Sequence, residues 1–271
     1  MMMSVFLAVF STFLHAAVVS AGCTLNCTTG TCYSDVTSGL DCLTSIPFNE
    51  EWANATVTVI SQSLENFGFD ALYHSTGPPY SINLDVQGEL ASTQAMIDSK
   101  QFATDLDFQE HMQNFIQKTQ DAHTRYQKPV CYNAIFVMPF SFDVRVEENI
   151  TNSLVDEPKV FTMRNLFSDE YNNVYPDVDI SALFEEQIET LNGVEATTEV
   201  SSWGDTHETR SNNRGIRFNA AIRSYLYRSA IQTSILPLEP LAVRLTNGVE
   251  FSLPWLVQYS AKLADVSYCA A

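Results

Sequence analysis

Hydrophobic residues recur at helical spacing in the stretch "NEEWANATVTVISQSLENF". Val57, Ile60, Leu64 and Phe67 are three or four positions apart, so they would share one face of a helix. The acidic residues before them favour the positive end of such a helix, and Gly68 follows as a stop signal. The pattern predicts a helix with one buried face.

Two further helices are predicted before residue 128. One covers roughly residues 86–100, after a loop that contains a Gly-Pro-Pro sequence. The other begins behind Asp107, a residue type that caps helix N-termini. Its apolar stripe comprises Phe108, Met112, Phe115, Ile116 and Thr119. The three stripes together predict a helical N-terminal domain over residues 46–128.

From Val130 onward the hydrophobic period changes from helical to alternating. In "CYNAIFVMPFSFDVRV" the side chains of Phe140, Phe142, Val144 and Val146 would lie on one face of a strand. The segment "PKVFTMRNLF" predicts a second strand of similar composition.

Two Asn-Gly dipeptides predict turns in the second half of the chain. Asn192-Gly193 follows a strand and precedes a short helix, and Asn247-Gly248 joins two strands. Because Asn and Gly both accept positive φ, we expect a two-residue hairpin at Asn247-Gly248.

Between these turns, "NNRGIRFNAAIRSYLYRSAI" predicts another helix. The apolar residues expected near one of its faces are Ile216, Ala220, Ile222 and Leu226. The whole pattern predicts an α+β fold, in which a half-open antiparallel β domain over residues 129–262 follows the helical domain.

The first residues resemble a secretory signal peptide. An apolar run from Val5 to Val19 ends in Val19-Ser20-Ala21, a small-residue cleavage pattern. The run is shorter than the roughly 20 residues of a membrane span. We expect residues 1–21 to be removed and the mature protein to be secreted, extracellular and without a membrane partner. The alternative is a buried or membrane-anchoring helix.

Cysteines and glycosylation sequons agree with a secretory route. Four cysteines lie in segment 22–45, which we expect to be too polar in composition to build a core: Cys23, Cys27, Cys32 and Cys42. We expect disulfides rather than a zinc site, with all three pairings of the four left open. Cys131 and Cys269 can pair with each other or with a cysteine outside the chain. Sequons begin at Asn26, Asn54 and Asn149.

The charge of the chain excludes one class of partner. It has 14 Lys and Arg against 32 Asp and Glu, a net charge of −18. Such a surface repels phosphate backbones, so we expect no nucleic-acid partner.

Common catalytic and cofactor motifs are absent from the sequence. It has no Gly-x-Ser-x-Gly elbow, no phosphate-binding glycine loop and no His-Glu-x-x-His pair. We therefore predict neither a metal nor a cofactor. His111 is expected to be a surface residue of the third helix, and His207 a residue of a solvated loop.

His123 lies where the helical pattern gives way to the strand pattern, in "TQDAHTRYQKPVC". An imidazole titrates near neutral pH and can therefore transfer protons. The alternative is an ordinary polar residue at the end of a helix, favourable to the helix dipole when charged.

Residues 45–262 resemble the N-terminal part of the tail-specific (C-terminal processing) serine peptidase family. The closer match is to its secreted eukaryotic branch and to the chlamydial protease-like activity factor. Four pieces carry the resemblance in order: "SIPFNEEWA", the loop and two helices that lead into Asp-x-His, "EQIETLNGVEA", and "NNRGIRFNAAIRSYLY" before a hairpin.

The resemblance implies a role for His123 and a PDZ-like arrangement of the β domain. His123 would be the general base, and the PDZ-like part would hold a protein or peptide substrate. The serine, the glutamate and the oxyanion amides would come from a later domain, whose start would be residues 263–271, so we expect this chain alone to be inactive. The alternative function is a secreted, non-catalytic module that binds peptides or proteins.

Overall fold

The fold is described from a computed structural model. It describes residues 23, 25, 27, 30–66, 73–74, 82–121, 124–146, 159–184, 186–208, 211, 213–235 and 238–260. The predicted signal peptide and the sequons at Asn26 and Asn149 lie outside the described residues. Within these ranges, no helix is long and apolar enough to cross a bilayer.

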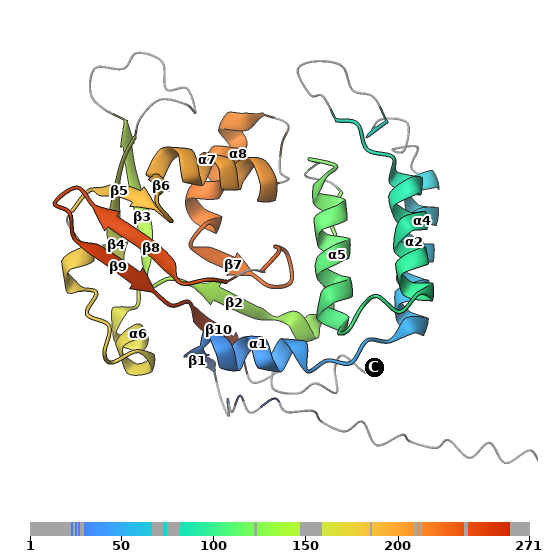
Figure 1. Ribbon diagram of the computed structural model, residues 1–271, viewed down its shortest axis with the longest axis horizontal. Helices are drawn as coiled ribbons and strands as arrows, with labels where there is room; N and C mark the ends of the chain where they lie inside the picture. Colours follow the sequence, from blue (N-terminus) through green and yellow to red (C-terminus); the bar gives the residue numbers. More distant parts are fainter. Residues whose placement is uncertain are drawn as a thin grey trace, which may run out of the picture.

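Three helices form a helical unit at one end of the molecule (Figure 1). They are α2 (Glu50–Asn66), α4 (Val86–Asp98) and α5 (Asp105–Gln117), which confirms all three predicted helices. The predicted stripe of α5 is buried, and its apolar members pack with Val57, Leu64, Leu90 and Ile97 in a core of their own.

The predicted N-cap of α5 is wrong by one turn. The cap is Thr104, whose hydroxyl accepts a hydrogen bond from the Asp107 backbone N–H at 3.2 Å. The Asp107 carboxylate in turn accepts from the Thr104 N–H at 2.9 Å. Asp107 is therefore the third residue of a capping box, a position where a carboxylate also favours a helix start.

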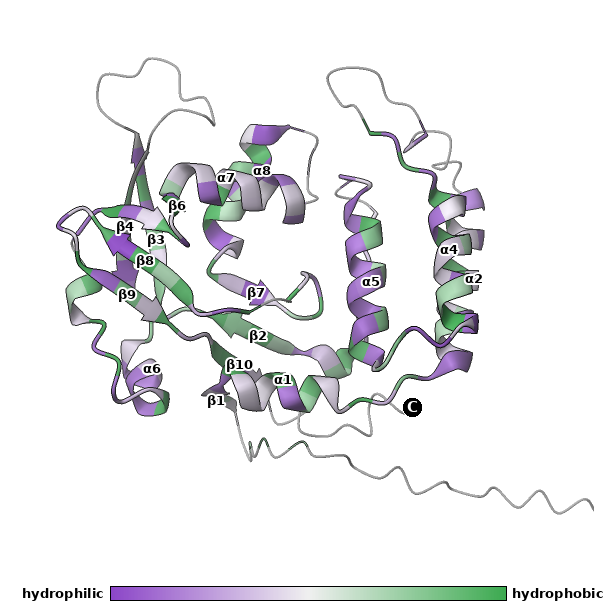
Figure 2. Cartoon of the chain, viewed as in Figure 1, coloured by the Kyte–Doolittle hydropathy of each residue, from purple (hydrophilic) through white to green (hydrophobic). Residues whose placement is uncertain are grey.

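Three antiparallel sheets make up the sheet unit, together with α1 (Val36–Thr44), α6 (Ser168–Val174), α7 (Ala196–His207) and α8 (Arg214–Ser224). One sheet has the order β1 (Thr31–Asp35), β10 (Leu256–Ser260), β2 (Ala134–Val137) and β7 (Tyr227–Ser229). Of its two central strands, β2 is hydrophobic throughout (Figure 2), and β10 begins with the buried residues Leu256 and Val257.

The other two sheets are smaller. One pairs β3 (Phe140–Val146) with β4 (Lys159–Asn165). The other has the order β6 (Val194–Glu195), β5 (Ile188–Leu191), β8 (Leu241–Leu245) and β9 (Glu250–Leu253). Short 3₁₀ turns cover Val130–Tyr132 and Ser181–Leu183. Helices and antiparallel sheets in one chain confirm the α+β class.

The cysteine-rich segment is part of the sheet unit, so the expectation that it is too polar for a core is wrong. β1 pairs with β10 along its whole length, although more than 200 residues separate them in sequence. Cys42 and Leu43 are buried in the same core as β10. Gly39 makes the closest approach, because a β-carbon there would lie 2.6 Å from the Val257 side chain.

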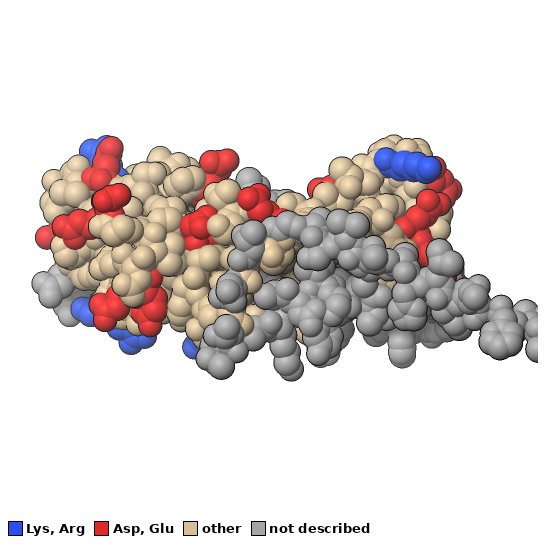
Figure 3. All heavy atoms as spheres, turned by 90° about the horizontal axis from the view of Figure 1, so that it is seen from below, with Lys and Arg blue, Asp and Glu red and all other residues tan. Residues whose placement is uncertain are grey.

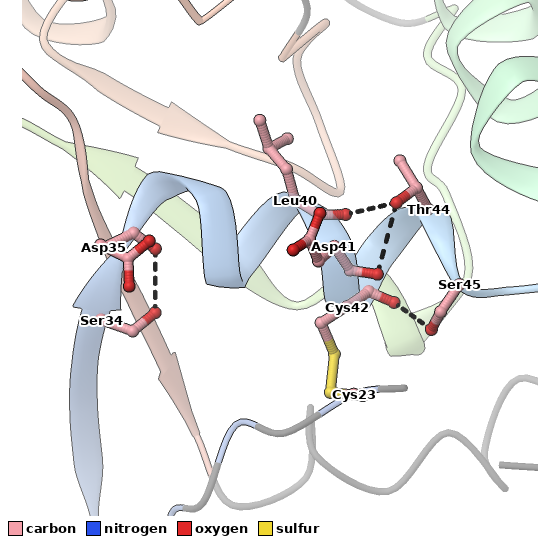
Figure 4. The surroundings of a disulfide bond; sticks show 8 residues. All are labelled: Cys23, Ser34, Asp35, Leu40, Asp41, Cys42, Thr44 and Ser45. Carbon is pink, nitrogen blue, oxygen red and sulfur yellow. Dashed lines mark hydrogen bonds between the residues drawn. A yellow bond between two sulfur atoms is a disulfide. The ribbon is translucent and has the colours of Figure 1, made fainter. Parts of the chain in front are cut away.

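Two disulfides select one of the three open pairings. Cys23 bonds to Cys42 on α1 (Figure 4), and Cys27 bonds to Cys32. Cys131 is also disulfide-bonded, and its partner lies outside the described residues. These bonds confirm the preference for disulfides over zinc.

The two Asn-Gly turns differ. At Asn192-Gly193 both residues have positive φ, 51° and 79°, as a two-residue hairpin requires. At the second turn only Gly248 does, with φ 87°, and its N–H donates to the Leu245 carbonyl. That geometry is a three-residue loop with a glycine bulge, so the predicted two-residue hairpin at Asn247-Gly248 is wrong.

The predicted buried face of α8 is also wrong. Ile216 is 51% exposed, whereas Arg217, Phe218 and Ala221 are buried. The Arg217 guanidinium is held by the Asp205 carboxylate at 2.7 Å, so the buried face contains a long cationic side chain that the apolar spacing did not include.

Candidate functional site

A buried ion pair joins the helical unit to the sheet unit. The ammonium of Lys128 lies 2.7 Å from the Glu110 carboxylate of α5, and neither side chain is more than 8% exposed. Lys128 also donates to the carbonyls of Ala230 and Thr233. Burial lowers the pKa of Lys128, and the nearby Glu110 opposes that shift. The second Glu110 oxygen accepts hydrogen bonds from the Ser234 hydroxyl and the Ile235 N–H.

Beside this joint lies a cleft of about 250 Å³, here called the central cleft. The helical unit and the segment after it contribute one wall, which includes Gln113, Thr124 and Arg125. The sheet unit contributes the other, which includes His207 and Tyr227. Amide, hydroxyl and ring groups dominate the lining, so the cleft suits a polar, hydrogen-bonding ligand.

Gln113 gives the central cleft an unused hydrogen-bond acceptor. Its side chain is 4% exposed, and its Oε1 atom has no hydrogen-bond partner among the described residues. A buried acceptor without a partner is costly. The oxygen itself is buried, so a ligand N–H or O–H would remove that cost only after the Gln113 side chain turned toward the cleft.

His207 lies at the end of α7, so its assignment to a solvated loop is wrong. Its ring stacks on Trp203 with ring centroids 4.8 Å apart. Its Nδ1 lies 3.1 Å from the Trp203 carbonyl and 2.6 Å from the Thr206 hydroxyl. Burial lowers the pKa of His207, which favours the neutral imidazole in the cleft. Next to it, the buried Glu208 carboxylate accepts a hydrogen bond from the Ser224 hydroxyl.

His123 lies outside the described residues, but the residues on both sides of it are held by hydrogen bonds. The Asp121 carboxylate accepts hydrogen bonds from the hydroxyls of Tyr73 and Thr124, both at 3.0 Å. The two hydroxyls are also 2.8 Å apart. Thr124 and Arg125, the residues that follow His123, line the central cleft.

A second hollow, of about 360 Å³, lies beside β3 and is here called the β3 groove. Phe140 and Phe142 of β3 line it, together with Ile222 of α8 and the following Leu226. Among the strands that the structure describes, β3 pairs only with β4, so one of its edges has no partner strand.

Two arginines also line the β3 groove, and Arg164 lies on the other face of the β3–β4 pair from Phe140 and Phe142. Arg164 lies on β4 opposite Ser141, and Arg223 is in the last turn of α8. Neither forms an ion pair or hydrogen bond within the described part of the chain. No sequence signal distinguished these arginines or Gln113. Their significance depends on the lack of an ion-pair or hydrogen-bond partner among the described residues, which a sequence does not show.

His111 is half-buried, so the expectation of a surface residue is wrong. Its Nε2 lies 2.9 Å from the Thr93 hydroxyl, and its ring lies against Phe102 at 5.5 Å. Burial lowers its pKa. These contacts give His111 a place in the packing between α4 and α5, away from both hollows.

No cluster of three metal-ligating side chains occurs among the residues that the structure describes. On the face seen from below, acidic side chains outnumber basic ones among the charged residues that the structure describes (Figure 3).

The sequence matches no known family description and no curated protein. Among solved structures, the chain is similar to mature CPAF, with 15% identity and a TM-score of 0.47 over 76% of this chain and 34% of that one. It is also similar to mature CPAF complexed with lactacystin, with 13% identity and a TM-score of 0.47 over 80% of this chain and 37% of that one. The chain thus spans little more than a third of either structure. Likenesses this distant assign no activity to it.

Proposed function

We propose that this chain is the general-base and substrate-binding part of a secreted serine endopeptidase that resembles the tail-specific family. The observation that carries the proposal is the position of Thr124 and Arg125 in the wall of the central cleft. A side chain at position 123 directly precedes these two lining residues. In this role the His123 imidazole accepts the proton of a serine and returns it to the leaving amine.

The resemblance assigns that serine to a domain that follows these residues, so His123 supplies one member of a site completed elsewhere. The described residues supply substrate contacts. Gln113 offers its unpartnered carbonyl to a peptide N–H. A neutral His207 accepts or donates one hydrogen bond without adding charge to the acidic chain.

A PDZ-like role for the β domain agrees with the free edge of β3. Domains of that kind bind an extended peptide as an added strand at a sheet edge, next to a helix. Here β3 is such an edge, and α8 borders the groove beside it. The disulfides Cys23–Cys42 and Cys27–Cys32 are compatible with an extracellular location.

Imidazole NMR tests whether His123 faces bound substrate. The secreted chain is titrated with peptides from reduced casein, and the ring signals are assigned with His123→Gln and His207→Gln. We expect the signals of both histidines to shift on binding, while that of His74, which lies outside the cleft, stays in place. A His123 signal that does not move while peptides bind would contradict the general-base role.

Turnover tests the base itself. In the full secreted protein, His123→Ala should lower kcat/KM for casein by at least about 10³-fold, because the base and the nucleophile act as a unit. His74→Ala is the matched control and should leave kcat/KM unchanged. Equal activity of His123→Ala and the parent would refute the proposal.

The free β3 edge also supports the second candidate, a secreted module that binds peptides without cleaving them. The two functions differ in a simple labelling experiment on the full secreted protein. A serine-directed fluorophosphonate labels a peptidase and leaves a pure binding module unlabelled.

A further inference from the structure

We infer that the β3 groove and the central cleft form one track for an extended peptide, and that the track selects an acidic side chain flanked by apolar ones. The inference rests on the proposed function, in that it specifies which peptides the chain holds. It is carried by the two unpaired arginines, by the apolar residues that line the same groove, and by two residues that the hollows share.

Arg223 and Tyr227 line both hollows. They therefore form a ridge between the β3 groove on one side and the central cleft on the other. Tyr227 is 47% exposed, so its ring is available at the top of the ridge. A peptide laid along the edge of β3 would cross this ridge and continue into the cleft.

The lining of the β3 groove determines the apolar part of the preference. Phe140 and Phe142 face it from the strand, and Leu226 faces it from the segment after α8. Leu166, at the end of β4, is 49% exposed at its margin. In an extended peptide alternate side chains point to the same side, so every second residue would meet this surface.

The charge preference follows from Arg164 and Arg223. The chain carries only 14 basic residues against 32 acidic ones, and four of its eight described arginines are paired with carboxylates. Two unpaired guanidiniums at one groove are therefore a local exception. No Asp or Glu is among the described residues that line the groove. A guanidinium binds a carboxylate through parallel hydrogen bonds, which makes Asp or Glu the complementary side chain.

The central cleft differs in charge, because Glu208 lines it together with Arg125 and Arg223, so its charged groups are of both signs. The acidic residue of the peptide thus belongs in the β3 groove, and the segment that enters the cleft is neutral. The Gln113 acceptor there fits a peptide N–H.

The test uses blocked peptides and the secreted chain. An eight-residue peptide of alternating Val and Thr, acetylated and amidated at its ends, carries Glu at one central position or Gln in its place. We expect at least tenfold tighter binding of the Glu peptide by fluorescence anisotropy, with a preference that shrinks as salt is raised. Arg164→Gln and Arg223→Gln should each remove most of that preference without weakening the Gln peptide.

Arg145→Gln is the matched control, because Arg145 lies on β3 but does not line the groove, is 73% exposed and is paired with Asp143. It should leave the preference unchanged. Equal binding of the two peptides would overturn the acidic selection and leave the proposed function standing. Binding that requires a free C-terminal carboxylate would also overturn the acidic selection, because the groove would then recognise the end of a peptide chain and not an acidic side chain. None of these peptides would bind, although casein peptides still did, if the chain's own residues occupied the groove. That result would also overturn the inference.

Discussion

The helical unit and the sheet unit reach a buried core by different routes. The helical unit uses helices close together in sequence, from Glu50 to Gln117, and its core residues come almost entirely from that stretch. The sheet unit places β1 against β10, strands from opposite ends of the described chain. Local contacts form at little cost in chain entropy, whereas distant pairings require long loops to close. Helical spacing alone therefore predicted the first unit well, and strand spacing alone did not reveal the partners in the second.

The largest expected effect comes from breaking the joint between the units. Lys128→Met leaves the buried Glu110 carboxylate without its cation, so we expect the free energy of unfolding to fall by about 3–5 kcal/mol in urea denaturation. Removing both charges in Lys128→Met/Glu110→Met should recover much of that loss, because a buried charge no longer remains unpaired.

The matched control is the Lys118–Glu89 pair, which has a similar distance of 2.9 Å but a half-exposed lysine. Lys118→Met should cost less than about 1 kcal/mol. Similar losses for the two lysines would contradict the buried joint.

A smaller effect tests the pairing of distant segments in the sheet unit. Gly39→Ala places a methyl group against Val257, and we expect a loss of about 1–3 kcal/mol from overpacking. In a Val257→Ala background the same change should cost less, because of the close atoms only the β-carbon of residue 257 remains, at 3.0 Å, and Ala favours a helix over Gly by about 0.5–1 kcal/mol. The double-mutant cycle measures this coupling.

Thr37→Ala on the exposed side of α1 is the control for Gly39→Ala and should change stability little. Independent costs for Gly39→Ala and Val257→Ala would show that α1 does not pack on β10 in solution.

The smallest effect concerns His111 in the helical unit. Burial lowers its pKa, so the unfolded chain binds a proton at a higher pH than the folded protein does. The free energy of unfolding should therefore fall as pH drops through about 6.5, the ordinary pKa of histidine, and level off below the lowered one. His207 contributes with the same sign.

His111→Gln should reduce this pH dependence between pH 7 and pH 5, as measured by urea unfolding midpoints. An unchanged slope in the variant would show that His111 is equally easy to protonate in both states.

Particular residues show how far sequence reasoning reached. The stripe from Phe108 to Thr119 predicted a buried helix face correctly, because apolar residues at helical spacing are all removed from water when that one face of the helix packs against a core. The same reasoning failed for α8, where Arg217 is buried against Asp205. An ion pair between two helices is invisible to a pattern that counts only apolar positions.

The candidate site was less predictable than the fold. The motif around His123 drew attention to the segment whose neighbours line the central cleft, and the role of His123 stays a prediction. Gln113, Arg164 and Arg223 were missed. Each is an ordinary polar residue in the sequence. Each became a candidate because it has an atom or group without a hydrogen-bond or ion-pair partner among the described residues, and only the folded structure shows that.

By itself, the sequence of this protein determined its longer helices, most of its strands, its excess of acidic residues and its preference for disulfides, because spacing, charge and cysteine content act locally. Tertiary structure alone decided that β1 joins β10, that Lys128 is buried with Glu110, and that two arginines share one groove. Those outcomes depend on contacts between segments far apart in the chain. Such contacts contribute to the free energy only in the folded arrangement, so local spacing in the sequence does not reveal them.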